Sequence, residues 1–451
     1  MTSVTTTEIS GWGRYPRAIA QVATPENVQA IDPRAGSHLI ARGLGRSYGD
    51  AAMLADGIVL LCERLNRTVS FDEATGLLTA EAGLSLREVL HEFVPRGWFP
   101  PVVPGTKSVT LGGCVAADIH GKNHHRDGTF GEHLSAFRLL LADGSHVLCS
   151  REHNSELFWA TIGGMGLTGV ITQVTMKLLA VTTAYVVVEH QRAKNLDESL
   201  ELFESKVGDD QYTVAWLDCF SHGSGLGRSI LIRGHHAGID ELPANSGNRL
   251  TENSPREFDL RFDFPSWLLN PFTVRWFNEL YYRRQGRRRS FISDYDSFFF
   301  PLDRIRNWNR MYGRRGFVQY QCVLPGPQSR LGLQLLLEEA RLSKRPSFLT
   351  VLKRFGPEGS GLLSFPMAGY TLTMDFPVSD VGLFTFLERL DEIVVKHGGR
   401  VYLAKDARLG ADVFRRMYSR LDQWLEVKRR FDPSDVFTSD LARRIGLISK
   451  P

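Results

Sequence analysis

The stretch 104–125, PGTKSVTLGGCVAADIHGKNHH, combines the small and the titratable side chains that a cofactor site requires. Glycines such as Gly112 and Gly113 let the backbone approach a bulky ligand and offer it N–H groups, which suits a phosphate-bearing cofactor. The polar run 118–125 would then place ionisable groups beside the ligand. A surface turn with clustered histidines is the alternative. A metal site on His120 and its neighbours is less favoured, because carboxylate ligands are not arranged around the histidines.

A second glycine-rich segment, Arg42–Asp50 (RGLGRSYGD), matches the dinucleotide-binding GxGxxG motif only loosely. Its third glycine stands at the wrong spacing and no amphipathic helix follows, which argues against a Rossmann site with the pyrophosphate at a helix N-terminus. A glycine loop between strands can still bind a pyrophosphate through consecutive N–H groups. Arg42, Arg46 and Ser47 would support that binding with charge and hydrogen bonds.

The elements that would position these segments alternate between short strands and helices up to about residue 183, which indicates an α+β domain. Strands are predicted at His38–Arg42, Ile58–Leu61, Leu77–Ala80, Leu134–Leu141, His146–Cys149 and Val170–Leu178. Helices are predicted at about Leu86–Val94, with Ser85 as the cap, and at Leu157–Ile162, after which Gly163–Gly166 ends the helix.

Longer connections and longer strands mark the chain beyond residue 183. Strands are predicted at Tyr212–Phe220, Phe317–Leu324, Ser347–Phe355 and Tyr370–Val378, with helices at Leu331–Leu342 and Gly382–His397 packed across their sheet. From Arg400 the sequence returns to a strand and charged helices.

Three of these strands carry polar side chains on one face, since side chains alternate along a strand. The residues that share a face are Gln319 with Gln321, Lys353 with Phe355, and Thr371 with Thr373 and Asp375. Aligned polar faces fit a sheet that covers a ligand. A face turned to solvent is the alternative for any single strand.

Composition indicates an ordinary globular protein: 451 residues, 43% hydrophobic and 23% charged, favour two domains. The balance of 54 basic and 50 acidic residues leaves +4, too little to indicate nucleic-acid binding. Five scattered cysteines favour reduced thiols over a disulfide framework or a zinc site. The sequence has neither a run of about 18 apolar residues nor a secretory signal, so we expect synthesis in the cytoplasm without a signal peptide.

Residues 263–291, DFPSWLLNPFTVRWFNELYYRRQGRRRSF, gather two tryptophans, a tyrosine pair and six arginines. Aromatic anchors beside a basic cluster favour an anionic membrane interface or a lipid-like ligand. A buried aromatic helix followed by a solvated arginine turn is the alternative.

The segments at 42–50, 104–125, 158–171 and 431–437, in this order and spacing, resemble the FAD-binding half of the vanillyl-alcohol-oxidase flavoprotein superfamily. Within it, ARGLGRSYGD, VTLGGCVAADIHGKNHH, VQYQ, FLTVLKRFG and YLAKD resemble the decaprenylphosphoryl-β-D-ribose oxidases, over about Trp12 to Leu447. The resemblance implies an α+β, two-domain FAD-binding fold with an inserted antiparallel-sheet substrate (cap) domain. The implied division is 1–183 and 400–451 for FAD, and 184–399 for substrate with a mobile aromatic and basic loop at about 263–291.

The resemblance also implies a reaction. FAD, held without a covalent bond because no attachment histidine or cysteine is evident, oxidises the 2′-hydroxyl of decaprenylphosphoryl-β-D-ribose to the 2′-keto sugar, with hydride passing to flavin N5. An NADH-dependent keto-reductase partner then yields the arabinose donor for cell-wall arabinan. Oxygen or a quinone would accept the electrons. Such proteins act at the membrane surface, and the envelope (periplasmic) side is possible by analogy.

The resemblance assigns roles residue by residue. The implied FAD-binding residues are Ala41, Arg42, Gly43, Leu44, Gly45, Arg46, Ser47, Tyr48, Gly49, Asp50, Gly105, Thr110, Leu111, Gly112, Gly113, Ala117, Asp118, Ile119, His120, Gly169, Ile171 and Tyr402. The implied substrate residues are Lys122, Trp216, Gln319, Gln321, Lys353, Phe355, Thr373 and Asp375.

Three residues are implied to be catalytic. Lys405 would place an ammonium near flavin N1 and the C2 carbonyl, where reduction leaves negative charge. A surface lysine paired to Asp406 is the alternative. Tyr48 and His120 would lie near the reactive carbon, and either could take the hydroxyl proton.

The chain departs from the family pattern at Thr373, where many mycobacterial members carry a cysteine, and at Thr371, where they carry asparagine. A threonine keeps the size without the thiol, so substrate oxidation should survive while thiol-directed inactivation should not. Two other functions remain open: a sugar-alcohol or aldonolactone oxidase of the same fold, and a non-catalytic flavin-binding scaffold. The segment 263–291 argues against a soluble substrate.

Overall fold

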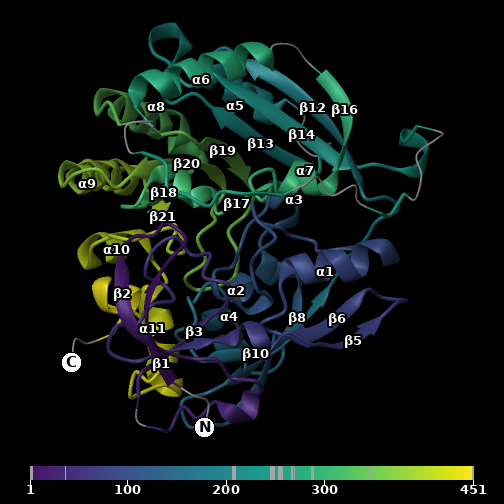
Figure 1. The fold of residues 1–451 in the computed structure, drawn as a ribbon, viewed down its shortest axis with the longest axis vertical. Helices are drawn as coiled ribbons and strands as arrows, with labels where there is room; N and C mark the ends of the chain where they lie inside the picture. Colours follow the sequence, from purple (N-terminus) through teal and green to yellow (C-terminus); the bar gives the residue numbers. More distant parts are fainter. Residues whose placement is uncertain are drawn as a thin grey trace.

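Two smaller sheets occupy the lower half of the molecule in Figure 1, and one large sheet occupies the upper half. This computed structural model describes residues 4–35, 37–205, 210–243, 249–251, 257–265, 268, 270–285, 289–345 and 347–448. The largest hydrophobic cluster includes Leu139 and Phe158 from the lower half and Leu324 and Leu372 from the upper half. One continuous core therefore joins the two halves.

The lower half contains a four-stranded sheet, in the order β1-β2-β4-β3, and a five-stranded sheet, in the order β5-β6-β10-β8-β9. Their strands are β1 (Val4–Ser10), β2 (Arg17–Ala23), β3 (Leu39–Arg42), β4 (Ile58–Leu61), β5 (Thr68–Asp72), β6 (Leu77–Glu81), β8 (Leu134–Leu140), β9 (His146–Ser150) and β10 (Val170–Lys177). Strands β7 (Trp98–Phe99) and β11 (Leu179–Ala180) form a separate antiparallel pair.

The upper half is built on an eight-stranded sheet in the order β16-β12-β14-β13-β19-β20-β18-β21. Its strands are β12 (Tyr185–Ala193), β13 (Tyr212–Leu217), β14 (Ser229–His236), β16 (Arg289–Asp294), β18 (Phe317–Pro325), β19 (Thr350–Phe355), β20 (Gly369–Pro377) and β21 (Arg400–Val401). All of its neighbouring strands run antiparallel. A separate parallel pair is formed by β15 (Phe258–Asp259) and β17 (Ile305–Arg306).

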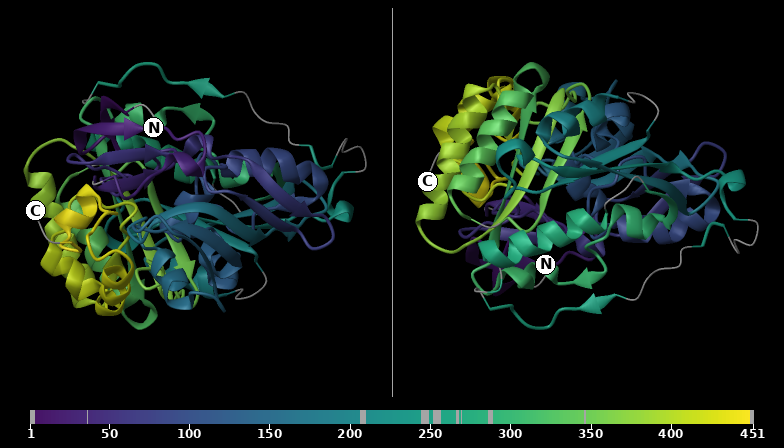
Figure 2. Two further views of the ribbon diagram at one scale, coloured as in Figure 1. Left: turned by 90° about the horizontal axis from the view of Figure 1, so that it is seen from below. Right: turned by 90° about the horizontal axis from the view of Figure 1, so that it is seen from above.

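Helices flank these sheets (Figure 1 and Figure 2). They are α1 (Leu86–Phe93), α2 (Leu111–Ala116), α3 (His124–Asp127), α4 (Ser155–Thr161), α5 (Leu196–Glu204), α6 (Pro271–Arg284), α7 (Tyr295–Phe299), α8 (Gly326–Leu342), α9 (Gly382–Lys396), α10 (Ala411–Met417), α11 (Leu421–Phe431) and α12 (Asp440–Arg444). Helices α8 and α9 pack on β18, and α5 packs on β12 and β14. No helix in the described ranges is long and apolar enough to cross a membrane.

Local sequence accounts for several element ends. Ser85 caps α1 in a capping box with Glu88, as its position before the apolar run predicts. The Asp143-Gly144 turn joins β8 and β9, with Gly144 at a φ of 83° that glycine adopts without strain. Both expectations from the sequence are confirmed.

The structure differs from the sequence prediction in several respects, of which the following bear on the site or on the large sheet. Within 263–291, residues 271–284 form helix α6 and residues 289–291 belong to strand β16, where the resemblance implies a loop. A helix was the alternative for this segment, and Asn270 caps it while Pro271 fits its first turn. The strand expected from Ser347 begins only at Thr350. Strands β1, β2, β12, β14 and β16 were not predicted, and the glycine-rich stretch at 111–116 is a short helix rather than a turn.

Candidate functional site

A single cavity gathers most of the residues implied by the resemblance. Those of the FAD set that line it are Ala41, Arg42, Gly43, Leu44, Gly45, Arg46, Ser47, Tyr48, Gly105, Thr110, Gly112, Gly113, Ala117, Ile119, His120, Gly169, Ile171 and Tyr402. Gln319, Gln321, Lys353, Thr373 and Lys405 line the same cavity. Segments far apart in sequence therefore face one shared space between the lower sheets and the upper sheet.

The glycine loop after β3 packs so tightly that side chains are excluded from it. A Cβ on Gly43 would stand 2.2 Å from Thr110 Oγ1, and one on Gly49 would stand 2.0 Å from the carbonyl oxygen of Asp406. Gly45 has a φ of 63°, which most residues adopt only with strain. The loop therefore presents its backbone to the cavity, as a phosphate-binding loop requires.

The two arginines of this loop have different surroundings. Arg42 donates to the carbonyl oxygens of Ala52 (3.1 Å) and Ser10 (2.6 Å), so its guanidinium braces the loop. Arg46 lies with its guanidinium carbon 4.0 Å from the ring centroid of Trp12, and burial lowers its pKa. Both arginines line the cavity, but the guanidinium of Arg46 makes fewer hydrogen bonds to the described part of the protein than that of Arg42 does.

Two buried polar atoms of the cavity wall indicate that a polar cofactor fits there. Within the part of the chain that the structure describes, Arg46 Nε and His120 Nδ1 are buried without a hydrogen-bond partner. Buried polar groups are normally satisfied, so such atoms point to a ligand that supplies acceptors or donors. An extended dinucleotide, with phosphates near the glycine loop and a polar ring system near His120, fits this wall.

Lys405 lies in the turn after β21, against the glycine loop. The Tyr48 amide donates to the carbonyl of Ala404 (2.9 Å), and Lys405 Nζ lies 3.8 Å from the centroid of the Tyr48 ring. Burial lowers the pKa of Lys405 to about 7, opposed by Asp375 and reinforced by Lys353. Lys405 is a half-buried residue at the cavity wall, and Asp406 forms its ion pair with Arg444 instead.

Asp375 lies behind the wall rather than in it. It is 0% exposed, and it accepts hydrogen bonds from Gln319 Nε2 (2.5 Å) and Tyr312 Oη (3.0 Å). Burial raises the pKa of this carboxyl to about 6, and Lys405 acts in the opposite direction. Its position suits a counter-ion for Lys405 better than a contact to substrate.

His120 is held by the polar face of the large sheet. Its Nε2 lies 2.9 Å from Gln321 Nε2, which also donates to Thr371 Oγ1 at 3.2 Å. Its ring meets the ring of Phe355 edge-on, with centroids 4.7 Å apart. Burial first, and then Lys353, lower the pKa of His120 well below its usual value, so the imidazole is neutral at neutral pH.

The polar faces predicted on three strands are adjacent in the sheet. Gln321 pairs with Thr373 across β18 and β20, and Val351 pairs with Thr373 across β20 and β19. Gln319, Gln321, Val351 and Thr373 all line the cavity. Part of the predicted polar face therefore lines the cavity rather than facing solvent, and its cover of a ligand stays a prediction.

Lys353 adds positive charge in the cavity lining, and Lys122 adds it from behind the lining. Lys122 donates to the carbonyl of Phe298, and its Nζ lies 4.2 Å from the centroid of that residue's ring. Burial lowers the pKa of Lys122 to about 7, with Lys353 lowering it further, and burial lowers the pKa of Lys353 to about 8. These ammonium groups would be stabilised by an anionic ligand.

Some of the implied residues lie behind the cavity lining rather than in it, namely Gly49, Asp50, Leu111, Asp118, Lys122, Trp216, Phe355 and Asp375. Asp118 accepts hydrogen bonds from Gly131 N and Ser364 Oγ and is 0% exposed, so it ties two loops together. Trp216 pairs with Val351 in the neighbouring strand, so it lies one strand away from the cavity lining. Their expected contacts with ligand stay predictions.

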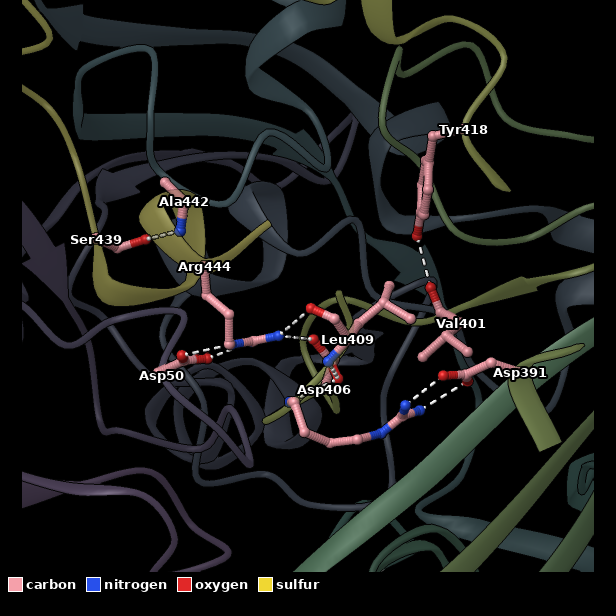
Figure 3. Close-up of polar contacts among 10 residues, drawn as sticks. Asp50, Asp391, Val401, Asp406, Leu409, Tyr418, Ser439, Ala442 and Arg444 are labelled. Carbon is pink, nitrogen blue, oxygen red and sulfur yellow. Dashed lines mark hydrogen bonds and ion pairs between the residues drawn. The ribbon is translucent and has the colours of Figure 1, made fainter. Parts of the chain in front are cut away.

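Figure 3 shows Arg444 between Asp50 and Asp406, two carboxylates outside the cavity lining. Arg444 on α12 bridges Asp50 Oδ1 (2.7 Å) and Asp406 Oδ2 (2.8 Å), and it also donates to the carbonyl of Leu409. Asp50 ends the glycine loop and Asp406 follows Lys405. One C-terminal guanidinium therefore fixes the glycine loop against the turn of Lys405.

Several cavity residues escaped the sequence prediction, among them Trp12, Met165, Gly166, Leu302, Trp308, Leu349, Val351 and Ala404. Met165 and Gly166 have positive φ, and their Gly-Gly-Met-Gly context was the available signal. Trp308, Leu302 and Leu349 carried no local signal, because only the tertiary fold brings their segments to the cavity.

The two histidines of α3, His124 and His125, form hydrogen bonds with backbone groups. His124 Nδ1 accepts from the Gly356 amide (3.1 Å), and His125 Nε2 lies 3.0 Å from the carbonyl of Asp210. Among the residues described, no three histidine, cysteine or acidic side chains converge as a metal site would require. All five cysteines are buried and unpaired.

Comparisons with known proteins agree with this geometry. A family model for the FAD binding domain matches residues 16–150, and a model for D-arabinono-1,4-lactone oxidase matches residues 371–445. The moss protein Physcomitrella patens BBE-like 1 has a similar fold, with a TM-score of 0.68 at 17% identity over 95% of this chain and 92% of that chain.

Sequence relatives extend over the whole chain. Decaprenylphosphoryl-β-D-ribose oxidase of Mycolicibacterium smegmatis is 40% identical over 98% of both chains. An uncharacterised Streptomyces coelicolor protein is 35% identical over 81% of this chain, and L-gulono-1,4-lactone dehydrogenase of Mycobacterium tuberculosis is 24% identical over 95%. The chain therefore belongs to the decaprenylphosphoryl-β-D-ribose oxidase family and is an FAD-dependent oxidoreductase.

Proposed function

We propose that this protein oxidises the 2′-hydroxyl of a polyprenylphosphoryl ribose, decaprenylphosphoryl-β-D-ribose, to the 2′-keto sugar. One observation carries the proposal: the polar wall of Gln319, Gln321, Lys353 and Thr373 faces the glycine cradle across the cavity that holds Lys405. Hydroxyl groups of a sugar suit amide and threonine side chains, and a phosphate suits buried lysines. The name of the relative that is 40% identical supports this substrate.

The residues divide between holding FAD and handling the proton. The glycine loop and Gly112–Gly113 would hold the dinucleotide through backbone N–H groups, with Arg46 beside its phosphates. Bound FAD supplies a hydride acceptor that the side chains of the protein cannot provide. Lys405 would stabilise the negative charge that develops on reduction.

His120 is the better candidate for the proton acceptor. Burial raises the pKa of Tyr48 well above its usual value and lowers that of His120, so the phenol keeps its proton and the imidazole is neutral. Proton acceptance at Nδ1 requires the tautomer in which Nε2–H donates to Gln321, and therefore a Gln321 amide flipped from the orientation in which its Nε2 donates to Thr371. These protonation states support His120 over Tyr48 as the proposed proton acceptor.

An anaerobic absorbance titration tests the proposal. Purified protein should carry FAD in about equal molar amount, and a detergent-solubilised polyprenylphosphoryl ribose should bleach the flavin near 450 nm, as flavin reduction does. The 2′-keto product should appear in proportion. Stable yellow protein that the lipid-linked ribose leaves unbleached contradicts the proposal.

An aldonolactone oxidase is the second candidate, because the lactone oxidase model matches residues 371–445 and a lactone dehydrogenase is 24% identical. L-Gulono-1,4-lactone in the same titration separates the two functions. We expect the lactone to reduce the flavin at least ~100-fold more slowly than the lipid-linked ribose does, since the lactone has no phosphate to pair with the lysines. Faster reduction by the lactone would reverse the assignment.

The partners follow from the chemistry of the product. A 2′-keto sugar needs a reductase to become an alcohol of inverted configuration, so we propose an NADH-dependent keto-reductase partner. Reduced flavin needs an acceptor, for which oxygen or a membrane quinone is proposed. A lipid-linked substrate places the protein at a membrane surface as a peripheral protein, and the exposed aromatic side chains of α6 support that location.

A further inference from the structure

A ladder of aromatic rings runs across the inner side of α6. The ring of Tyr281 meets that of Trp216 edge-on at 4.9 Å between centroids and stacks on that of Phe277 at 5.9 Å. Phe277 in turn contacts the ring of Phe348 at 5.1 Å. Residues four apart on a helix lie on the same face, so Phe277 and Tyr281 form one continuous strip.

The inner end of this ladder lies at the cavity wall. Phe348 directly precedes Leu349, which lines the cavity together with Val351. Trp216 pairs with Val351 between β13 and β19. The ladder therefore stands one residue or one strand pairing away from Leu349 and Val351, the apolar part of the cavity lining.

The outer end of the ladder opens onto the protein surface. Three side chains of α6 are exposed there: Phe272 is 78% exposed, Trp276 65% and Leu280 50%, while Phe277 is 37% exposed. Large apolar side chains gathered on one exposed helix face mark a binding surface. The apolar side chains thus extend from Phe348, next to the cavity lining, to the exposed face of α6.

Helix α6 is anchored so that this strip keeps its place. Asn278 Nδ2 donates to Asp218 Oδ1 (2.7 Å), and Tyr282 Oη donates to the carbonyl of Ala193 (3.1 Å). Arg228 forms ion pairs with both Asp218 and Glu279. The polar groups hold one side of the helix to the sheet and leave the aromatic side free for an apolar ligand.

We propose that this ladder is the track along which the polyprenyl chain of the substrate leaves the cavity and reaches the surface of α6. The inference rests on the proposed function, because only a lipid-linked sugar requires an apolar path that begins beside the sugar site. Isoprene units are flat and apolar, and they pack well on aromatic faces. Leu349 and Val351 take the first units, the Trp216–Tyr281–Phe277 rings the next, and Trp276 the emerging chain.

The dependence of KM on chain length tests this track. Phe277→Ser is compared with the wild type on two detergent-solubilised substrates, decaprenylphosphoryl ribose and an analogue with a single isoprene unit. We expect KM for the long substrate to rise about 10-fold, the loss of one aromatic contact, with kcat unchanged. For the short analogue, both constants should stay within about 2-fold.

Trp276→Ser removes the exposed end of the track and cannot disturb the core, so it is the second variant and should act in the same direction. Leu331→Ser, at a residue that is 53% exposed on α8, is the matched control and should leave both substrates unchanged. An equal rise of KM for both substrates means a purely structural role, and unchanged constants mean that the chain runs elsewhere. Either result overturns the track.

Two further outcomes distinguish a lipid track from a membrane contact and from a wrong substrate. If Trp276→Ser reduces co-sedimentation with anionic liposomes but leaves the chain-length dependence in detergent intact, α6 is a membrane contact only, and the track is overturned. If neither substrate bleaches wild-type flavin, the proposed function itself fails. A track that fails while wild-type turnover persists leaves the proposed function standing.

Discussion

Three lysines share the positive charge of one partly enclosed site. Lys353 lowers the pKa of Lys122 and that of Lys405, after burial, which is the larger cause for both. Asp375 is the buried carboxylate that acts in the opposite direction on Lys405. Lysines whose pKa values are lowered in this way favour the binding of anions, because a bound anion stabilises the charged ammonium form.

The pH dependence of flavin reduction should report Lys405. Its pKa is lowered to about 7, so the ammonium is present below that pH and is lost as the pH rises through it. We expect the second-order rate constant of anaerobic reduction, measured well below saturation so that it reports the enzyme before substrate binds, to fall between pH 6 and pH 8. Stopped-flow absorbance measures it. A second-order rate constant that climbs over this range contradicts an ammonium role.

Removing the lysine should remove both rate and pH dependence. Lys405→Met should lower the rate of flavin reduction by roughly 100-fold or more, as loss of one oxyanion donor does. The pH effect between 6 and 8 should disappear with it. Lys344→Met, at an exposed lysine, is the control. Near wild-type reduction in Lys405→Met would falsify this role.

Thr373 sets the reactivity of the pocket toward thiol-directed ligands. It lines the cavity, whereas Cys62, a thiol in that lining, has its pKa raised by burial to about 12 and stays protonated. We expect no cavity adduct in the wild type, and stoichiometric labelling in Thr373→Cys with turnover retained. Peptide mass spectrometry locates the adduct. Labelling at position 62 in the wild type contradicts this expectation.

At the scale of elements, α12 matters because it carries Arg444. Ser439 caps this short helix by accepting from the Ala442 amide, which aims Arg444 at Asp50 and Asp406, as Figure 3 shows. The two carboxylates are 4% and 3% exposed. The C-terminal segment thus stabilises the contact between the glycine loop and the turn of Lys405.

Arg444→Met should therefore destabilise the protein strongly. Removing the shared cation leaves two buried carboxylates unpaired, which costs about 3–5 kcal/mol. Arg443→Met is the matched control, since its partner Asp56 is 72% exposed, and it should cost about 1 kcal/mol or less. Denaturant unfolding of holoenzyme gives both values. Equal losses of unfolding free energy for the two substitutions would mean that the bridge from Arg444 to Asp50 and Asp406 stabilises the protein no more than a surface ion pair does.

At the scale of the whole molecule, the cavity lies where the two halves meet. Its lining comes from the glycine loop and α2 below, from β18, β19 and β20 above, and from the turn at 402–405. A ligand that touches all of them must stabilise their arrangement, because it binds the folded state and has no such site in the unfolded chain.

FAD should therefore act as a clamp between the halves. Adding FAD to apoprotein at 100 times its dissociation constant should stabilise the fold by about 2.7 kcal/mol and raise the melting temperature. Calorimetry of apoprotein with and without FAD measures the shift, and riboflavin, which lacks the phosphates, is the control. Equal melting temperatures with and without FAD would contradict the clamp.

Tyr48 and Lys405 show how far the sequence reached. The segments YGD and YLAKD identified both residues by resemblance, and glycine spacing indicated a phosphate-binding loop. Their contact depends on the hydrogen bond between Tyr48 N and the Ala404 carbonyl, which joins positions more than 350 residues apart. No local pattern encodes such a contact, because it is made only when both halves pack.

Residue types, spacing and side-chain alternation were sufficient for the α+β class, the glycine cradle, the Ser85 cap and the polar faces of β18, β19 and β20, since these are properties of neighbours along the chain. The burial of Asp375, the bridging role of Arg444 and the aromatic ladder of α6 required the folded molecule. The reason is that desolvation, ion pairing and packing depend on what surrounds a side chain in space, and those surroundings come from distant segments.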